Sequence, residues 1–332
     1  MDDFSQFRPE EKTVYDDSYF MRKNTETKTL RKLSFYAGLA VILYVFIQNV
    51  IIVIIEGLGL IDLYTKNSLF QSGTDIFLII LGILLPFSLL GKKMQKASGE
   101  AEPVLMEPVK RKKILLYGIF GCTGCVMLAN IFSSYITYFI SLIGYELDSP
   151  DIQMPDGMFG FAVTMLRVSI LAAVVEEFCL RGHVMGNLRR YGDVFAVLMS
   201  SAIFALMHGN LIQVPFAMLS GVALGIFSIK TGSIWPAIMA HAINNGLSVA
   251  ISYLIKIVGE EPGMLLYSYA MYVLIFIGLV AAFAFAMNTK DRPLKRGNTV
   301  LKPFEKTFHY LFTAPTVVAF LIMVTITAQS VS

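Results

Sequence analysis

Long apolar runs separated by short polar connections dominate the chain. Several runs reach the length of about 20 residues that an α-helix needs to cross a bilayer. They predict an all-α, polytopic transmembrane helical bundle of eight or nine spans. Pro315 interrupts the last run and leaves the count between eight and nine, and Pro86 is expected to kink the short second run. The expected spans are residues 33–55, 76–90, 114–143, 161–188, 194–208, 214–229, 234–255, 266–287 and 310–328.

The polar connections divide the chain into four parts. Residues 1–32 form a polar N-terminal segment, and residues 33–160 hold the first three spans with a basic linker at 91–113. Residues 161–255 carry the polar groups discussed below, and residues 256–332 add the C-terminal helices. No internal repeat relates these parts. This disfavours a secondary transporter, because many transporters are built from paired repeats.

Composition excludes an ordinary soluble domain. Hydrophobic residues make up 55% of the chain and charged residues 15%, against roughly 25% charged residues in an average soluble protein. The lipid bilayer is therefore an expected partner, and nucleic acid is not. The three cysteines, Cys122, Cys125 and Cys179, include no extramembrane pair, so we expect them to pack in the bundle rather than form disulfides.

The distribution of Lys and Arg predicts an orientation. The acidic connections 56–75 and 144–160 fall on one side of the membrane if every span is real. The positive-inside rule assigns Lys- and Arg-rich connections to the cytoplasmic side. We therefore expect a multi-pass protein of the cell membrane, or of an endomembrane in a eukaryote, with its N-terminus in the cytoplasm. The basic segments that fall on this cytoplasmic side are residues 1–32, 91–113, 189–190 and 288–306.

Two adjacent carboxylates and an arginine lie inside the fourth run, at Glu176, Glu177 and Arg181. Ionisable groups are expensive to bury in a membrane and often mark functional sites. Glu177 and Arg181 stand four residues apart, so they share a helix face and are expected to neutralise each other. Glu176 is turned roughly 100° away and has no charged partner at helical spacing, which leaves it for chemistry. Arg167, early in the same run, is expected to extend to the outer headgroups.

Two later runs add imidazole and carboxamide groups. His208 ends the fifth run, and His241 and Asn245 share a face of the seventh because they lie four residues apart. At 1.5 Å per residue, Glu176 lies about 20 Å, His208 about 22 Å and His241 about 14 Å along their helices from the turns on the basic side. The three side chains can therefore converge on one cavity.

Structural roles compete with this interpretation. A single His or Asn in a membrane helix more often holds helices together by hydrogen bonds than catalyses a reaction. We expect that structural role for Asn244, which faces away from Asn245, and solvated positions at the membrane surface for His183 and His309. The occurrence of a carboxylate and two imidazoles in order on three separate runs favours a functional site.

These groups match the needs of amide hydrolysis. Glu176 can act as a general base, the imidazoles can position a water or stabilise an oxyanion, and Asn245 is a neutral donor to the same oxyanion. His208 and His241 could also bind a divalent metal such as Zn²⁺, which would polarise the water. The chain has no His-Glu-x-x-His helix, so separate helices must assemble any metal site.

Three motifs follow one another in this part of the chain: Glu176-Glu177-x-x-x-Arg181, Phe204-x-x-x-His208 and His241-x-x-x-Asn245. Each motif alone is common, whereas all three in order on membrane segments are specific. Together they resemble the pattern of the CAAX prenyl protease and bacteriocin-processing (CPBP) family of intramembrane metalloproteases. The family is also called the type II CAAX endopeptidase or Abi family. The resemblance covers residues 161–255.

The resemblance implies roles for the polar side chains. Glu176 would activate a water that His208 helps to hold, and His241 and Asn245 would stabilise the oxyanion. The glutamate–arginine pair described above would support the motif helix. The substrate would be a peptide or a lipidated protein in the membrane, including the CAAX type. A glutamate-activated water alone and one assisted by a divalent metal both remain compatible with the motifs.

Three classes of function stay open. The resemblance favours a membrane-embedded endopeptidase, and no motif position departs from the family pattern. The family also includes members linked to immunity against bacteriocins and to scaffolding, in which proteolysis is dispensable. A transporter would use the glutamate and the histidines as proton relays. For the endopeptidase, we expect an active cavity that opens toward the cytoplasm.

Overall fold

The computed structural model describes residues 17–99, 107–145, 147 and 152–330. Half of the predicted polar segment 1–32 therefore lies outside the described residues. The same holds for residues 100–106 of the predicted basic linker, and for Glu146, Asp148 and Asp151 of the predicted acidic connection.

All the regular elements of the described ranges are helical. The N-terminal elements are α1 (Asp17–Gly57), α2 (Ile61–Lys66), α3 (Ser68–Leu78), the π-helical segment η1 (Ile79–Leu84), α4 (Leu85–Ser98) and α5 (Lys112–Leu142). A central run contains α6 (Gly157–Thr164), π-helical η2 (Met165–Leu171), α7 (Ala172–Glu177), π-helical η3 (Phe178–Met185), α8 (Gly186–Leu188) and the 3₁₀ turn η4 (Arg189–Tyr191). The remaining helices are α9 (Asp193–Met207), α10 (Gln213–Thr231), α11 (Trp235–Val258), α12 (Glu260–Asn288), α13 (Pro303–Leu311) and α14 (Ala314–Ala328).

The predicted all-α membrane fold is confirmed. Within the described residues, 7 helical runs are long and apolar enough to cross a bilayer, or 8 if α13 and α14, which are bent by 72°, form one span. The segment predicted as a fifth span forms α9, which has only 15 residues. At 1.5 Å per residue it is about 22 Å long, shorter than the bilayer core of about 30 Å. It is an inner helix with many buried side chains.

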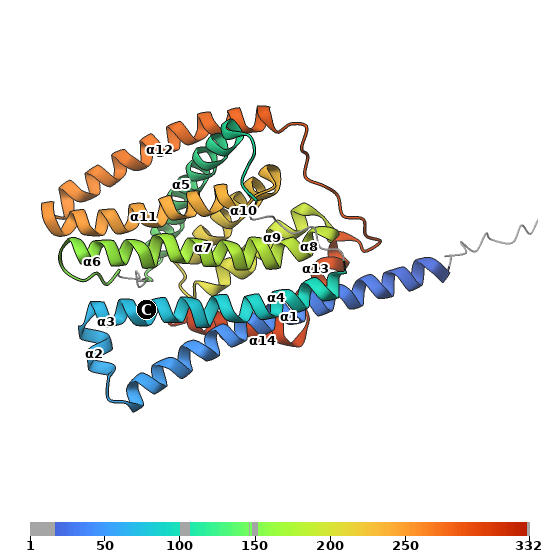
Figure 1. Ribbon diagram of the computed structural model, residues 1–332, viewed down its shortest axis with the longest axis horizontal. Coiled ribbons are helices and arrows are strands. Elements are labelled where there is room, and N and C mark those ends of the chain that lie inside the picture. Colours follow the sequence, from blue (N-terminus) through green and yellow to red (C-terminus); the bar gives the residue numbers. More distant parts are fainter. Residues whose placement is uncertain (1–16, 100–106, 146, 148–151, 331–332) are drawn as a thin grey trace, which may run out of the picture.

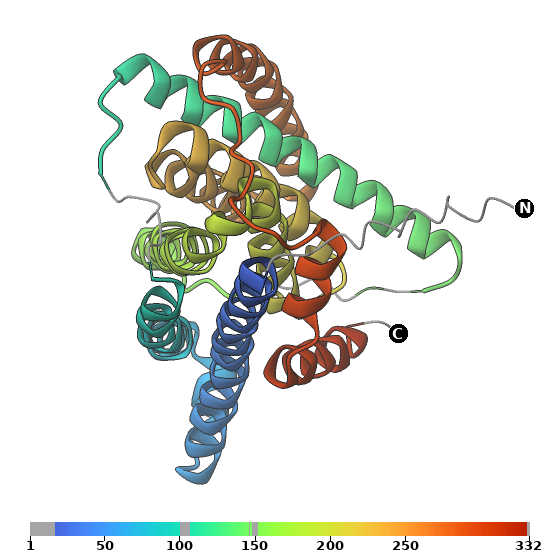
Figure 2. The same ribbon diagram turned by 90° about the vertical axis from the view of Figure 1, so that its right-hand side faces the viewer.

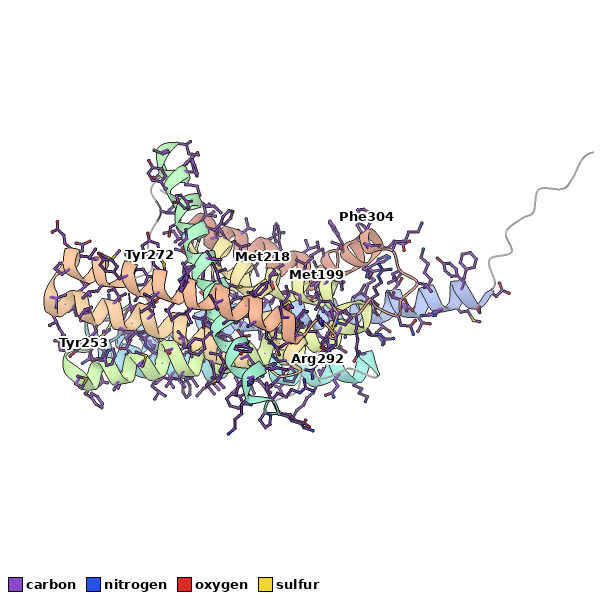
Figure 3. The ribbon with its side chains drawn as sticks, turned by 90° about the horizontal axis from the view of Figure 1, so that it is seen from above. Met199, Met218, Tyr253, Tyr272, Arg292 and Phe304 are labelled. Carbon is purple, nitrogen blue, oxygen red and sulfur yellow. The ribbon has the colours of Figure 1, made fainter. Side chains whose placement is uncertain are left out.

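The central run from α6 to α8 is surrounded by the other helices (Figure 1). In that view, α11 and α12 lie above it, and α1, α3 and α4 lie below. The end-on view shows α14 close to α1, with which it is in contact (Figure 2). Helix α5 crosses the bundle steeply, and its C-terminal part projects beyond the other helices (Figure 3).

Glycine allows α5 and α12 to cross closely. A Cβ atom at Gly278 of α12 would overlap the Cα atom of Gly124 of α5, so neither position has room for a side chain. Small residues of this kind let membrane helices approach and gain van der Waals contact, which is a main source of their association in lipid.

Hydrogen bonds join the basic segments at one end of the bundle, which we call the basic end. Described residues of all four basic segments take part in these contacts, and the cytoplasmic orientation stays a prediction. The connection between α5 and α6 lies at the opposite end (Figure 1). The contacts run from Arg22 to Asn298 Oδ1 (2.7 Å), from Lys306 to the Tyr191 carbonyl (2.7 Å) and from Arg190 to the Ser98 carbonyl.

Candidate active site

Helix α7 presents the two adjacent carboxylates in different environments. The side chain of Glu177 is 0% exposed, whereas that of Glu176 is 20% exposed and lines a cavity. π-helical segments lie on both sides of α7, as η2 before it and η3 after it. Such segments are rare and occur often at functional sites, because they re-aim side chains relative to a regular helix.

The Glu177 carboxylate contacts Arg181 on its own helical run and His241 on α11. Its Oε1 atom lies 3.1 Å from Nη1 of Arg181 and 2.9 Å from Nδ1 of His241. Arg181 also donates to the Gly221 carbonyl at 3.2 Å and stacks over the Phe204 ring at 4.7 Å. The predicted ion pair is present. The bond from Glu177 to His241 was not predicted, and it fixes the orientation of the imidazole.

His241 faces both glutamates. Its Nε2 atom lies 3.7 Å from Oε2 of Glu176, too far for a direct hydrogen bond. A gap of this size accommodates a bridging water or a substrate oxygen. Glu176, Glu177 and Arg181 together carry one net negative charge when all are ionised. Uncompensated buried charge is costly, so the contacts that Arg181 and His241 make with Glu177 matter for the stability of the cluster.

His208 reaches the same cavity from the end of α9. Its Nδ1 atom lies 2.8 Å from the Phe204 carbonyl, which can only accept, so Nδ1 carries the proton. In the neutral imidazole, Nε2 is then an acceptor. The Phe204 ring packs edge-on against both His208 and His241, with centroids 4.7 Å and 5.7 Å away. The predicted convergence of Glu176, His208 and His241 is thus confirmed.

Three asparagines form a chain of hydrogen bonds beside the imidazoles. Asn130 of α5 donates to Asn244 Oδ1 (2.7 Å), and Asn244 donates to Asn245 Oδ1 (3.0 Å). Asn245 in turn donates to the Val168 carbonyl of η2 (3.1 Å). The expectation that Asn244 faces elsewhere was wrong, because it lines the same cavity as Asn245. Asn130 was not predicted, although the polar spacing of Asn130, Ser133 and Thr137 on one helix face could have indicated it.

Two cavities meet at the site. The larger, of about 710 Å³, is lined by Glu176, both imidazoles and the asparagine chain. The smaller, of about 170 Å³, includes Tyr44 of α1. Glu176, His208 and Gln213 line both cavities, so the Glu176 carboxylate lies between them. Tyr44 lies in the first expected span and Gln213 in the connection before the sixth, and their sequence positions gave no signal of this role.

The larger cavity extends away from the basic end. On α11 its lining runs from His241 to Ser248, toward the end of that helix that meets α12. Its lining also includes Leu147 and Ile152 of the connection between α5 and α6, at the opposite end of the bundle. The described lining therefore extends toward the end opposite the basic segments, whereas the expected opening was toward the cytoplasm, on the side of those segments. Sequence periodicity could not reveal this direction.

Two further side chains differ from expectation. The Nε2 atom of His183 is buried without a hydrogen-bond partner rather than solvated, and the imidazole leaves no room for a Cβ atom on Gly91 of α4. Arg167 does not extend to the headgroups. It is buried, pairs with Asp75 of α3, and donates to the Gln153 carbonyl at 2.9 Å. Arg167 is therefore neutralised by a carboxylate on another helix instead of by the membrane surface.

The side chains of the site determine whether it can bind a metal ion. His208 and His241 both have Nδ1 hydrogen-bonded, which is the usual arrangement in metal-binding histidines. However, the described residues contain no group of three or more His, Cys, Asp or Glu side chains arranged to hold a metal ion. A catalytic zinc site normally has three protein ligands. The donor set is therefore incomplete, and the two-histidine metal site stays a prediction.

The fold and the site define a polytopic helical membrane protein with a carboxylate–imidazole site in the interior of its bundle. Residues 158–247 match the sequence model of the family described as Type II CAAX prenyl endopeptidase Rce1-like. This part of the chain is a domain of that family, and all three motifs lie inside it. No curated protein and no solved structure matches the chain.

Proposed function

We propose that this protein is a membrane-embedded endopeptidase in which Glu176 activates the attacking water. The observation that carries the proposal is the division between the two glutamates. Glu177 is fully buried and engaged by Arg181 and His241, whereas Glu176 faces the cavity 3.7 Å from the imidazole. Membership of a CAAX endopeptidase family domain supports a protease.

The proposed reaction begins with a water beside Glu176. The carboxylate takes one proton from this water, and Nε2 of His208 accepts a hydrogen bond from the other. The water oxygen then forms a bond to the carbonyl carbon of the peptide. Glu176 next passes its proton to the peptide nitrogen, the C–N bond breaks, and the products are a carboxylic acid and an amine. General base catalysis of this kind typically contributes about 10²–10⁴-fold to the rate.

The developing oxyanion needs donors. In the proposed reaction His241 acts with both ring nitrogens protonated, so that its Nδ1–H donates to Glu177 and its Nε2–H donates to the oxyanion. Asn245 has two N–H groups, of which one donates to the Val168 carbonyl and leaves the other for the oxyanion. Preorganised donors in a site shielded from water are usually the largest single contribution to acyl transfer.

The test is cleavage of a peptide library, including prenylated CAAX peptides, by the purified protein in detergent. Products are identified by mass spectrometry for the parent and for Glu176→Gln. Cleavage that falls by at least about 10²-fold in the variant would support the proposal. Parallel reactions with a chelator, followed by added Zn²⁺, test the two-histidine metal prediction.

An immunity or scaffold function predicts a different outcome. Neither protein would cleave any peptide, and the Glu176→Gln variant would keep the biological function of the parent. Both proteins are compared at equal concentration after size-exclusion chromatography, so that misfolding of the variant is not mistaken for loss of catalysis.

A further inference from the structure

The chemistry of the two cavities restricts the substrate, provided that the proposed endopeptidase function holds. Beyond Glu176 and the two imidazoles, the described residues that line the larger cavity carry no charge. They present hydroxyl and carboxamide groups from two facing helices. These are Asn130, Ser134 and Thr137 on α5, and Asn244, Asn245 and Ser248 on α11.

Neutral polar groups of this kind suit a peptide backbone. An extended segment exposes an N–H and a C=O group at every residue, and inside a membrane each of these needs a partner. Hydroxyl and carboxamide side chains can donate and accept, so they can pair with either group. The cavity volume of about 710 Å³ lies within the range of about 300–1,000 Å³ typical of ligand sites.

Space on both sides of Glu176 indicates that the chain continues past the reacting bond. The larger cavity lies on one side, and the cavity of about 170 Å³ beside Tyr44 lies on the other. Within the part of the chain that the structure describes, no Lys or Arg that could pair with a terminal carboxylate lines either cavity. Nearby Arg167 and Arg181 are engaged by Asp75 and Glu177.

The lining of the larger cavity reaches the end of the bundle opposite the basic segments. Leu147 and Ile152 line the cavity there, whereas Arg292 and Phe304 lie toward the other end of the molecule (Figure 3). Tyr253, on the same helix as His241, lies at the end of the molecule away from Arg292 and Phe304 in that view.

We propose that the site takes an extended, uncharged internal segment of a polypeptide, which enters from the end opposite the basic segments. The substrate's C-terminal carboxylate plays no part in its recognition. This differs from removal of a C-terminal tripeptide, in which the distance to the chain end defines the bond that is cut.

The first test uses one peptide that the parent protein cleaves. It is synthesised as a free acid, as a C-terminal amide and with a C-terminal extension of several alanines. A site that binds a substrate group by buried polar contacts rejects analogues without it by about 10⁴-fold. We therefore expect all three forms to be cut at the same bond, with kcat/KM equal within about threefold. A cut that moves with the chain end, or an amide that is not cut, would overturn the inference while leaving the endopeptidase intact.

The second test concerns the entrance. Thr137→Cys places a thiol in the cavity lining, and Tyr138→Cys places one beside it on the exposed surface of α5. Modification with a maleimide should stop cleavage in the first variant and spare it in the second. If the maleimide inhibits cleavage equally in both variants, or in neither, the larger cavity is not the substrate-binding site. Background labelling is measured on the parent, in which Cys122 and Cys179 are buried.

The direction of entry is read in sealed vesicles with a membrane-impermeant maleimide. Thr137→Cys should react from the same side as Asp62→Cys in α2, and from the side opposite to Lys290→Cys. Reaction together with Lys290→Cys would contradict the proposed entrance. If instead no peptide is cleaved by the parent or by Glu176→Gln, the proposed function fails, and the labelling result still reports where the cavity opens.

Discussion

Removal of Arg181 should destabilise the folded protein strongly. Its guanidinium lies 3.1 Å from the Glu177 carboxylate, and both side chains are 0% exposed. At that separation, an effective dielectric constant of about 20 gives an attraction of about 5 kcal/mol. Arg181→Leu would leave Glu177 with His241 as its partner, while Glu177 Oε2 already lacks a hydrogen bond. Breaking one side of a buried pair typically costs about 3–5 kcal/mol, which we expect here.

Equilibrium unfolding of the purified protein in detergent measures this loss. A matched control is Lys66→Leu, which removes an ion pair of the same i,i+4 spacing to Asp62 at 2.9 Å, with both side chains more than three-quarters exposed (76% and 80%). Screening by solvent makes such surface pairs contribute little, so the control should change stability hardly at all.

The double variant Glu177→Gln with Arg181→Leu separates charge from packing. It removes both charges, so it should recover much of the stability lost in Arg181→Leu, because no carboxylate is then left without its cation. If Arg181→Leu unfolds within about 1 kcal/mol of the parent, the buried pair does not stabilise the motif helix and the reasoning is wrong.

Three other changes test the site and the packing. Asn245→Ala should lower kcat by about 10²–10³-fold through loss of an oxyanion donor, and a loss below tenfold in a peptide cleavage assay would remove it from that role. Asn130→Ala should cost about 1 kcal/mol of unfolding free energy and lower kcat more than it changes KM, because it orients the carboxamides indirectly; an unchanged kcat would contradict this. In Gly278→Ala the added Cβ atom would overlap Gly124. The free energy of unfolding should fall by about 1–3 kcal/mol, as is typical of overpacking. Gly57→Ala, where a Cβ meets nothing within 4 Å, is the control, and equal effects would refute the packing argument.

Features with a short sequence range could be predicted well. The Glu177–Arg181 pair follows from helical spacing, and the apolar runs predict the membrane helices. The similar depth of His208, His241 and Glu176 could also be predicted. That estimate needs only the helix rise per residue and the positions of the turns.

Features that depend on contacts between distant segments could not be predicted. The bond from Glu177 to His241 joins residues 64 positions apart, and the Asn130–Asn244 bond joins residues 114 positions apart. Helical periodicity gives which face a residue occupies on its own helix, but not which helix that face meets. For the same reason the pairing of Arg167 with Asp75 and the direction of the cavity became visible only in the folded chain.

The central claim is that two adjacent carboxylates have different tasks. The most direct measurement compares turnover and unfolding temperature for Glu176→Gln and Glu177→Gln. Both variants and the parent are purified in the same way and assayed with the same peptide. The account predicts that Glu176→Gln abolishes peptide cleavage and keeps the unfolding temperature of the parent, whereas Glu177→Gln lowers the unfolding temperature. Continued cleavage by a folded Glu176→Gln protein would contradict the account.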